Sequence, residues 1–306
     1  MGEKAIVKRV DHIVFRTENP YELFSIFADI LRLPVVWSVS KYKFFTSGGV
    51  YAGNAYLEAV NFGNAISKDN AEAQLWGVAF EPYSLPESLD ELRRRNVPHS
   101  PPFSYTGTRI DGKSGVAWTN VTLGGLLSNS WKTFYLGKRF GGNSYINLLL
   151  GRIAGKLFMS RLGGLLVSKF LDDSMVYLCE YTHDNEALRD AKHKELIAGQ
   201  GGALGVEGVK EVVIGVTEFE EKQSRWQGLL APTLPFAPAS WQPDGGVAVR
   251  LVLHSENVIK LLVLKVASLT KARNFLAERG MLGINLGHGI TISPARIQGL
   301  NIYLVE

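Results

Sequence analysis

The chain contains one cysteine, Cys179, among 306 residues. A single thiol cannot close a disulfide within the chain, so we expect a reducing, cytoplasmic compartment. The opening residues, MGEKAIVKRV, hold no apolar stretch of signal-peptide length, and no later run is long and apolar enough for a confident transmembrane helix. These absences predict a cytoplasmic protein without a membrane-spanning segment.

Charge of either sign is also scarce. Charged residues make up 20% of the chain, hydrophobic residues 46%, and the formal net charge is +4. Such a small excess of positive charge gives no support for nucleic-acid binding, and we expect none. The composition is that of a globular protein with ample core material, and the length fits two domains or an internally duplicated unit.

Acidic residues are missing from the long span between Asp111 and Asp172, which carries eight lysines and arginines. Within an insertion at about 126–172, basic residues recur at helical spacing among leucines and other apolar residues. This pattern predicts a basic amphipathic helix. Three roles remain open for the segment 126–170: a lid over a site, a subunit contact in a homodimer, or a peripheral contact with a membrane surface. So much apolar sequence favours a hydrophobic, small-molecule substrate.

The order of predicted elements repeats along the chain. Residues 5–16 alternate as a strand, with Val10, His12 and Val14 expected on one face. Pro20 opens a predicted helix at 21–31, and short strands follow that end with 55–60, giving a β-α-β-β-β unit. Gly48-Gly49 is expected to separate two of these strands.

Three further starts of the same unit follow the first. They begin with strands near 75–80, 209–216 and 260–266, and the second closes with a strand at 175–181 after the insertion. A charged helix at 184–198 and a glycine-rich linker follow the second unit. The sequence therefore predicts an α+β protein of tandem βαβββ units, paired into domains at 1–198 and 205–306.

Four short stretches carry a resemblance to a known family: Asp11-His12-Ile13-Val14-Phe15, Ala55-Tyr56-Leu57-Glu58, Asp111-Gly112 with Ala117-Trp118, and Tyr177-Leu178-Cys179-Glu180. In this order they resemble the vicinal oxygen chelate superfamily (glyoxalase/bleomycin resistance/dioxygenase), in its glyoxalase-like branch. The resemblance implies that paired units form cupped mixed sheets, with metal ligands on the first and last strands of each unit.

Carried over by position, the resemblance implies His12, Glu58 and Glu180 as metal ligands, while Gly77 leaves the fourth position without a side chain. An imidazole with two carboxylates suits a divalent Fe, Mn, Zn, Ni or Co ion. Three protein ligands leave room for a substrate oxygen, which the metal would polarise as a Lewis acid. Glu58 or Glu180 is the candidate catalytic base.

These residues predict a metal-dependent lyase, isomerase or dioxygenase, although a single histidine argues against extradiol cleavage. Arg109 and Trp118 are the candidate substrate-binding residues. The alternative is a metal-free protein that binds or sequesters an apolar ligand, with His12 packed as an ordinary core histidine.

Two other patterns are given structural interpretations. Residues 107–114 match the residue pattern of a phosphate-binding loop. That pattern requires a helix after it, whereas β-rich sequence follows here, so we expect a turn. In the second half, Glu211 takes the place of His12 and Glu306 that of Glu58. We expect that half to be structural or to shape the pocket.

Overall fold

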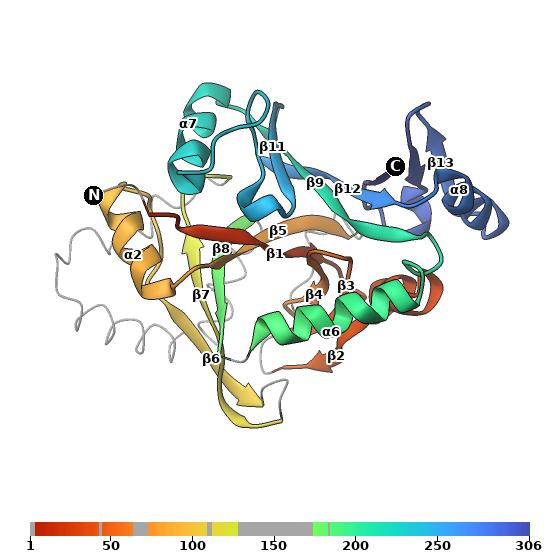
Figure 1. The fold of residues 1–306 in the computed structure, drawn as a ribbon, viewed down its shortest axis with the longest axis horizontal. Coiled ribbons are helices and arrows are strands. Elements are labelled where there is room, and N and C mark those ends of the chain that lie inside the picture. Colours follow the sequence, from red (N-terminus) through yellow and green to blue (C-terminus); the bar gives the residue numbers. More distant parts are fainter. Residues whose placement is uncertain (1–3, 43–44, 64–72, 109–111, 128–173, 183) are drawn as a thin grey trace.

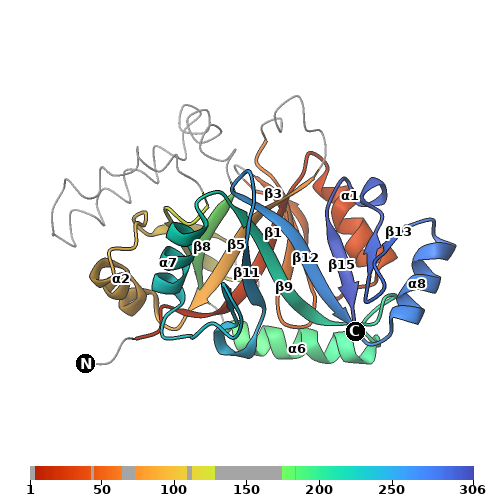
Figure 2. The same ribbon diagram turned by 90° about the horizontal axis from the view of Figure 1, so that it is seen from above.

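The computed structural model describes residues 4–42, 45–63, 73–108, 112–127, 174–182 and 184–306. In this part of the chain the strands form two mixed sheets, of eight and seven strands. Both sheets are curled, and β5 (Gln74–Pro82) of the first lies against β12 (Val258–Val266) of the second (Figures 1 and 2). The α+β class and the two cupped mixed sheets predicted from the sequence are confirmed.

The first sheet has the order β2-β3-β4-β1-β5-β8-β7-β6. Strand β1 is parallel to β4 and antiparallel to β5, which is parallel to β8, so the two units meet at the β1–β5 pair. Its other strands are β1 (Val7–Arg16), β2 (Val35–Lys41), β3 (Thr46–Tyr51), β4 (Tyr56–Asn61), β6 (Phe103–Thr108), β7 (Ser114–Leu123) and β8 (Met175–Tyr181).

The second sheet repeats this plan with the order β10-β11-β9-β12-β15-β14-β13. Its third unit adds only two strands after its helix within the described chain, so the expectation of three strands there is wrong. Its other strands are β9 (Val206–Val216), β10 (Ser240–Trp241), β11 (Ala248–Leu253), β13 (Leu282–Asn285), β14 (Ile290–Ile292) and β15 (Ile302–Val305).

Helices connect and flank the sheets. The first begins at Pro20, where the Asn19 side chain accepts a hydrogen bond from the Glu22 backbone and caps the helix. The helical segments are α1 (Pro20–Ser25), the π-helical turn η1 (Ile26–Ile30), α2 (Leu85–Arg94), α6 (Asn185–Ala198), α7 (Phe219–Leu230), α8 (Leu269–Glu278), and the short η3 (Pro243–Gly245) and η4 (Pro294–Arg296).

One continuous cluster of buried apolar side chains contains residues of both sheets, among them Phe15, Phe80, Trp226 and Leu264. Full burial of each such side chain is worth about 1.5–3 kcal/mol. On its other side, each sheet carries a smaller buried cluster. We call these the first cup face (Val14, Val60, Trp76, Ala79, Tyr177 and Cys179) and the second cup face (Val213, Val263, Tyr303 and Val305).

A β-bulge in β1 decides which side chains reach the first cup face. Val10 pairs with Phe80 and His12 pairs with Ala79, so Asp11 is an extra residue between them. The extra residue interrupts the alternation of the strand. Val10 therefore lies in the shared core and not on the side of His12 and Val14, and the prediction that grouped the three is wrong.

Glycines in β3 act within the strand and not between strands. Gly48 and Gly49 belong to β3, where a methyl group would meet the side chains of Val39 and Trp37 at less than 3 Å. The two glycines thus allow β2 to pack closely, and their predicted role as strand separators is wrong.

Residues 107–114, which match the phosphate-loop pattern, end at the first residue of β7, a strand that pairs with β6. A strand follows them where a phosphate loop requires a helix. Most of the insertion, residues 128–173, lies outside the described chain, so its predicted roles stay predictions. Leu126 and Leu127 at its start are buried. Among the described residues, no helix has the length and apolar character needed to span a membrane.

Candidate active site

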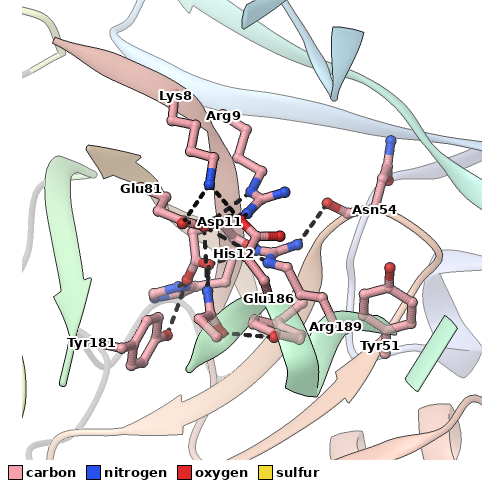
Figure 3. A network of polar contacts seen from close by, with 12 residues as sticks. Lys8, Arg9, Asp11, His12, Tyr51, Asn54, Glu81, Tyr181, Glu186 and Arg189 are labelled. Carbon is pink, nitrogen blue, oxygen red and sulfur yellow. Dashed lines mark hydrogen bonds and ion pairs between the residues drawn. The ribbon is translucent and has the colours of Figure 1, made fainter. Parts of the chain in front are cut away.

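The Asp11–His12 pair is the centre of the polar group on the first cup face. The Nδ1 atom of His12 lies 2.6 Å from a carboxylate oxygen of Asp11, and both side chains are almost completely buried. Asp11 also accepts hydrogen bonds from Tyr181 and Arg189 (Figure 3). Because the carboxylate engages Nδ1, Nε2 of His12 is the nitrogen left to face the cup.

Glu58 approaches that nitrogen from β4. One of its carboxylate oxygens lies 3.4 Å from His12 Nε2. The other accepts a hydrogen bond of 2.5 Å from the Ser47 hydroxyl, which itself accepts from the Trp37 indole. The structure therefore brings together two of the three predicted metal ligands, and their outer atoms are held by neighbouring side chains.

Tyr177 is the third polar group at this point, and it was not predicted from the sequence. Its hydroxyl lies 2.6 Å from His12 Nε2. Strand register explains its place: Glu58 pairs with Val14, two residues beyond His12, and Tyr177 pairs with Ala79, two residues beyond Gly77. Tyr177 thus occupies in the second unit the position that Glu58 occupies in the first.

Glu180 is not brought to this group. Alternation along β8 places it on the side of Val176 and Leu178, which belong to the shared core. Its carboxylate accepts a 2.9 Å hydrogen bond from the backbone N–H of Leu85, the first residue of α2. Negative charge is favourable at a helix N-terminus, so this contact accounts for the residue structurally.

The second sheet repeats the contact of Glu180. Glu306 follows Tyr303 by three residues, as Glu180 follows Tyr177, and its carboxylate accepts from the backbone N–H of Leu269, the first residue of α8, at 2.6 Å. The same helix-terminal role in both sheets separates Glu180 and Glu306 from the cup positions. Among the described residues, no group of three histidine, cysteine or acidic side chains is arranged to hold a metal.

Charges and burial set the protonation of these groups. Burial lowers the pKa of His12, but the hydrogen bond and charge of Asp11 and the charge of Glu58 outweigh it, and the net result is a raised pKa. Burial raises the pKa of Asp11, yet Arg189 and His12 hold it well below its usual value. Burial and then the charge of Glu58 raise the pKa of Tyr177 well above 10.0, so its phenol keeps its proton.

Aromatic side chains from two hairpins stand beside the polar group. Trp118 of β7 stacks on Tyr105 of β6, with ring centroids 5.0 Å apart, and packs against the first cup face. Tyr42 stacks on Phe45 at 4.6 Å and meets Tyr105 edge to face. Burial, and after it the charge of Glu58, raise the pKa of Tyr42. We call Tyr42, Phe45, Tyr105 and Trp118 the aromatic wall.

Two other candidates have different outcomes. Arg109, a predicted substrate-binding residue, lies outside the described residues, and its role stays a prediction. Cys179 is buried on the first cup face, and burial raises the pKa of its thiol well above 9.0. A thiol held in its protonated form is a poor nucleophile, so the structure favours a packing role for Cys179.

The second cup face carries a different set at the same register positions. Glu211, like His12, follows a bulged residue, and Arg250 pairs with Val213 as Glu58 pairs with Val14. Glu211 and Arg250 form a two-pronged ion pair with N–O distances of 2.6 and 2.9 Å. Leu261 stands where the first sheet has Gly77, and Tyr303 where it has Tyr177.

No protein-family model matches the chain, and no curated protein matches its sequence. Solved structures do match its fold over nearly the whole length. The Mn(II)-bound glyoxalase from Novosphingobium aromaticivorans has a TM-score of 0.54 at 8% identity, covering 98% of this chain and 82% of that chain. A hypothetical protein from Staphylococcus aureus has a TM-score of 0.56 at 9% identity, covering 97% and 98%.

Homoprotocatechuate 2,3-dioxygenase from Brevibacterium fuscum, in a complex with 3,4-dihydroxyphenylacetate, has a TM-score of 0.56 at 10% identity. The match covers 100% of this chain and 82% of that chain. The chain therefore has the vicinal oxygen chelate fold of glyoxalases and extradiol dioxygenases. At these identities the likeness establishes the fold, while the chemistry of the site has to be argued from its own residues.

Proposed function

We propose that this chain is a metal-dependent enzyme of the glyoxalase-like type, acting on an oxygen-bearing small molecule with a planar, apolar body. The observation that carries the proposal is the convergence of His12 Nε2, the Glu58 carboxylate and the Tyr177 hydroxyl at one point of the first cup face. Each comes from a strand position that the paired units have in common.

The donor set fits a divalent metal ion. Two atoms that ligate one ion, each about 2.0–2.2 Å from it, are roughly 3 to 3.5 Å apart, and Nε2 of His12 lies 3.4 Å from the Glu58 carboxylate. The carboxylate behind His12 is the usual outer partner of a metal-binding imidazole. The Tyr177 oxygen, at 2.6 Å from Nε2, is closer than this range and would move away from His12 to become the third donor. One nitrogen and two oxygen donors suit Fe, Mn, Zn, Ni or Co.

In the proposed reaction, a metal held by His12, Glu58 and Tyr177 would act as a Lewis acid on a carbonyl or enolate oxygen. The chain's own residues supply proton handling around it. Asp11 fixes the His12 ring through Nδ1, and Ser47 holds the outer oxygen of Glu58. Glu58 is the candidate base that accepts a substrate proton, and the Tyr177 oxygen is the candidate third donor, which would lose its phenol proton on binding the metal.

One histidine in place of two separates this set from the two-histidine, one-carboxylate iron site of non-haem oxygenases. Isomerase or lyase chemistry is therefore proposed ahead of ring cleavage. The aromatic wall of Tyr42, Phe45, Tyr105 and Trp118 supports a substrate with a flat apolar body, since stacked rings favour such a partner.

A metal-free ligand-binding protein is the second candidate, and one observation favours it. The Tyr177 hydroxyl already partners His12 Nε2 at 2.6 Å, so the polar groups satisfy one another without an ion. In that case His12, Glu58 and Tyr177 would hold one another, and the aromatic side chains of Tyr42, Phe45, Tyr105 and Trp118 would bind the apolar ligand.

Metal titration of tag-free protein separates the two candidates. Calorimetry with Mn(II), Fe(II), Co(II), Ni(II) and Zn(II) should show one site per chain for at least one of them. We expect His12→Ala and Glu58→Gln to abolish that site and Tyr177→Phe to weaken it. Glu180→Gln, the matched control, should leave it intact because that carboxylate serves α2.

A ferric-loaded sample adds a spectroscopic test, because phenolate bound to Fe(III) gives a charge-transfer band that should vanish in Tyr177→Phe. Absence of saturable binding of all five metals to the wild-type protein would reject the metal-dependent candidate in favour of the metal-free one. Loss of binding in Glu180→Gln, with Tyr177→Phe unaffected, would return the third ligand to Glu180.

A further inference from the structure

A buried arginine on α6 holds the carboxylate that holds His12. Arg189 donates from one terminal nitrogen to the Asp11 carboxylate at 2.5 Å and to the Asp11 backbone carbonyl at 3.0 Å (Figure 3). Its side chain is 5% exposed and that of Asp11 is fully buried. A buried carboxylate needs a charge partner and several donors, and Arg189 is the cation in direct contact with it.

The guanidinium is itself fixed on several sides. Its other terminal nitrogen donates to the Asn54 carbonyl at 3.0 Å, and its carbon lies 4.5 Å from the centre of the Tyr56 ring. The Asn54 side chain exchanges two hydrogen bonds with the backbone of Val209 in β9, at 2.8 and 2.9 Å. Arg189 is thus anchored to the second sheet through Asn54.

We propose that Arg189 is a positioning residue for the site: it fixes Asp11, and through Asp11 the tautomer and orientation of the His12 ring. The two hydrogen bonds that Arg189 donates to Asp11 constrain both the Asp11 side chain and the bulged backbone that carries it. The other carboxylate oxygen of Asp11, which also accepts from the Tyr181 hydroxyl at 3.0 Å, is directed at His12 Nδ1 at 2.6 Å. The inference rests on the proposed role of His12 but applies to a metal ligand and to a hydrogen-bonding histidine alike.

The test compares Arg189→Met with Arg9→Met. Arg9 lies in the same polar network and is 19% exposed, but among the described residues its ion-pair partners are Glu81 and Glu186, not Asp11. The readout is the low-field Nδ1–H proton resonance of His12 in metal-free protein labelled with ¹⁵N-histidine. The chain has six histidines, so His12→Gln assigns the resonance.

We expect to observe the resonance in the wild type and in Arg9→Met, and to find it lost or strongly shifted in Arg189→Met. Arg189→Lys should recover it in part, because lysine restores the positive charge but not the several N–H donors of the guanidinium. Arg189→Gln replaces the methionine variant if that variant does not fold. A folded Arg189→Met or Arg189→Gln with an unchanged resonance would overturn the inference. Failure of all three Arg189 variants to fold would also overturn it, because the residue would then be needed for the fold itself.

Metal affinity provides the second, independent readout. Loss of an outer partner of a metal-binding histidine costs about 10- to 100-fold in affinity, and we expect this loss in Arg189→Met and not in Arg9→Met. A resonance that responds to Arg189 in a protein that binds no metal would uphold the positioning role and reject the metal. A normal metal site that is indifferent to Arg189 would do the reverse.

Discussion

The two cup faces have corresponding strand positions but carry different polar side chains at them. At matched positions the first has His12, Glu58, Gly77 and Tyr177, and the second has Glu211, Arg250, Leu261 and Tyr303. In the second, Glu211 and Arg250 neutralise each other, and a leucine occupies the place of the glycine. The scaffold therefore offers the positions, and the side chains decide whether they form an open polar group or a closed ion pair.

The difference extends to the bulged residues that precede these positions. In β1 the bulged residue is Asp11, which is buried and paired with Arg189, whereas in β9 it is Lys210, which is exposed. Among the described side chains, a buried pair of charges, Asp11 and Arg189, therefore lies beside His12 in the first sheet, and the bulged residue of β9 provides no such pair beside Glu211. Under the proposed function, the buried Asp11–Arg189 pair would distinguish the first cup face from the second as much as the proposed ligating atoms do.

The largest expected effect contrasts these two bulged residues. Asp11→Ala leaves Arg189 buried without its main partner, and breaking such a pair costs about 3–5 kcal/mol. Lys210→Ala removes an exposed side chain and should change stability by less than about 0.5 kcal/mol. Urea unfolding of the metal-free protein measures both, and equal costs would remove the contrast between the sheets.

A graft tests whether ligating atoms suffice on the second cup face. Glu211→His combined with Arg250→Glu recreates the histidine–glutamate pair there, without a carboxylate behind the histidine. We expect a second metal site that is about 10- to 100-fold weaker than the first, which corresponds to the value of the missing outer partner. Calorimetric stoichiometry reports it, and a grafted site as tight as the first would make Asp11 and Arg189 dispensable.

The pH dependence of stability should come from the first cup face. The pKa of folded His12 is raised above its ordinary 6.5. Its stabilising contribution is therefore fully present below about pH 6.5 and is lost as the pH rises through the folded pKa. The loss amounts to about 1.4 kcal/mol for each pH unit that separates the folded pKa from the unfolded one. The raised pKa of Arg250 keeps it charged throughout this range.

Unfolding midpoints of metal-free wild type and His12→Gln between about pH 6 and 9 measure this contribution. The wild type should lose stability relative to the variant as the pH increases. A constant difference between the two proteins would contradict the assignment.

The smallest expected effect concerns Gly77, the cup position that has no side chain. A methyl group on Gly77 would lie 3.2 Å from Val14 Cβ and 3.5 Å from the Tyr177 ring, so neighbours must shift by a few tenths of an ångström. The strain and the lower entropy of the unfolded chain oppose each other, and Gly77→Ala should change stability by less than about 1 kcal/mol. Metal affinity should stay within a few-fold, and a complete loss would mean that the vacancy belongs to the metal site.

The sequence allowed the element order, the curled paired sheets and the meeting of His12 with Glu58 to be predicted. Strict alternation along β1 predicted that Val10 lies on the face of His12 and Val14. This was wrong because the bulge at Asp11 adds one residue, which the hydrophobic periodicity does not reveal. Two polar residues in succession, Asp11 and His12, inside an apolar strand were the available signal of that bulge.

The structure places Tyr177, and not Glu180, beside His12, and the sequence prediction missed this placement for a related reason. A match by residue type selected the glutamate, although alternation along MVYLCEY puts Glu180 with Val176 and Leu178 and leaves the tyrosines on the opposite face. That alternation could have identified Tyr177. The anchoring of Arg189 on Asn54 and β9 could not be inferred, since it joins residues more than a hundred positions apart.

The bulge in β1 also bears on how this gene can vary. Asp11 is the extra residue of the bulge, so an in-frame loss of its codon would leave Val10 opposite Phe80 and His12 opposite Ala79, and the two faces of the strand would be kept. The loss would instead remove the carboxylate that contacts His12 and Arg189. A strand shortened at this codon should therefore have the same defect as Asp11→Ala, and selection on the length of β1 here is selection for the carboxylate that the extra residue carries.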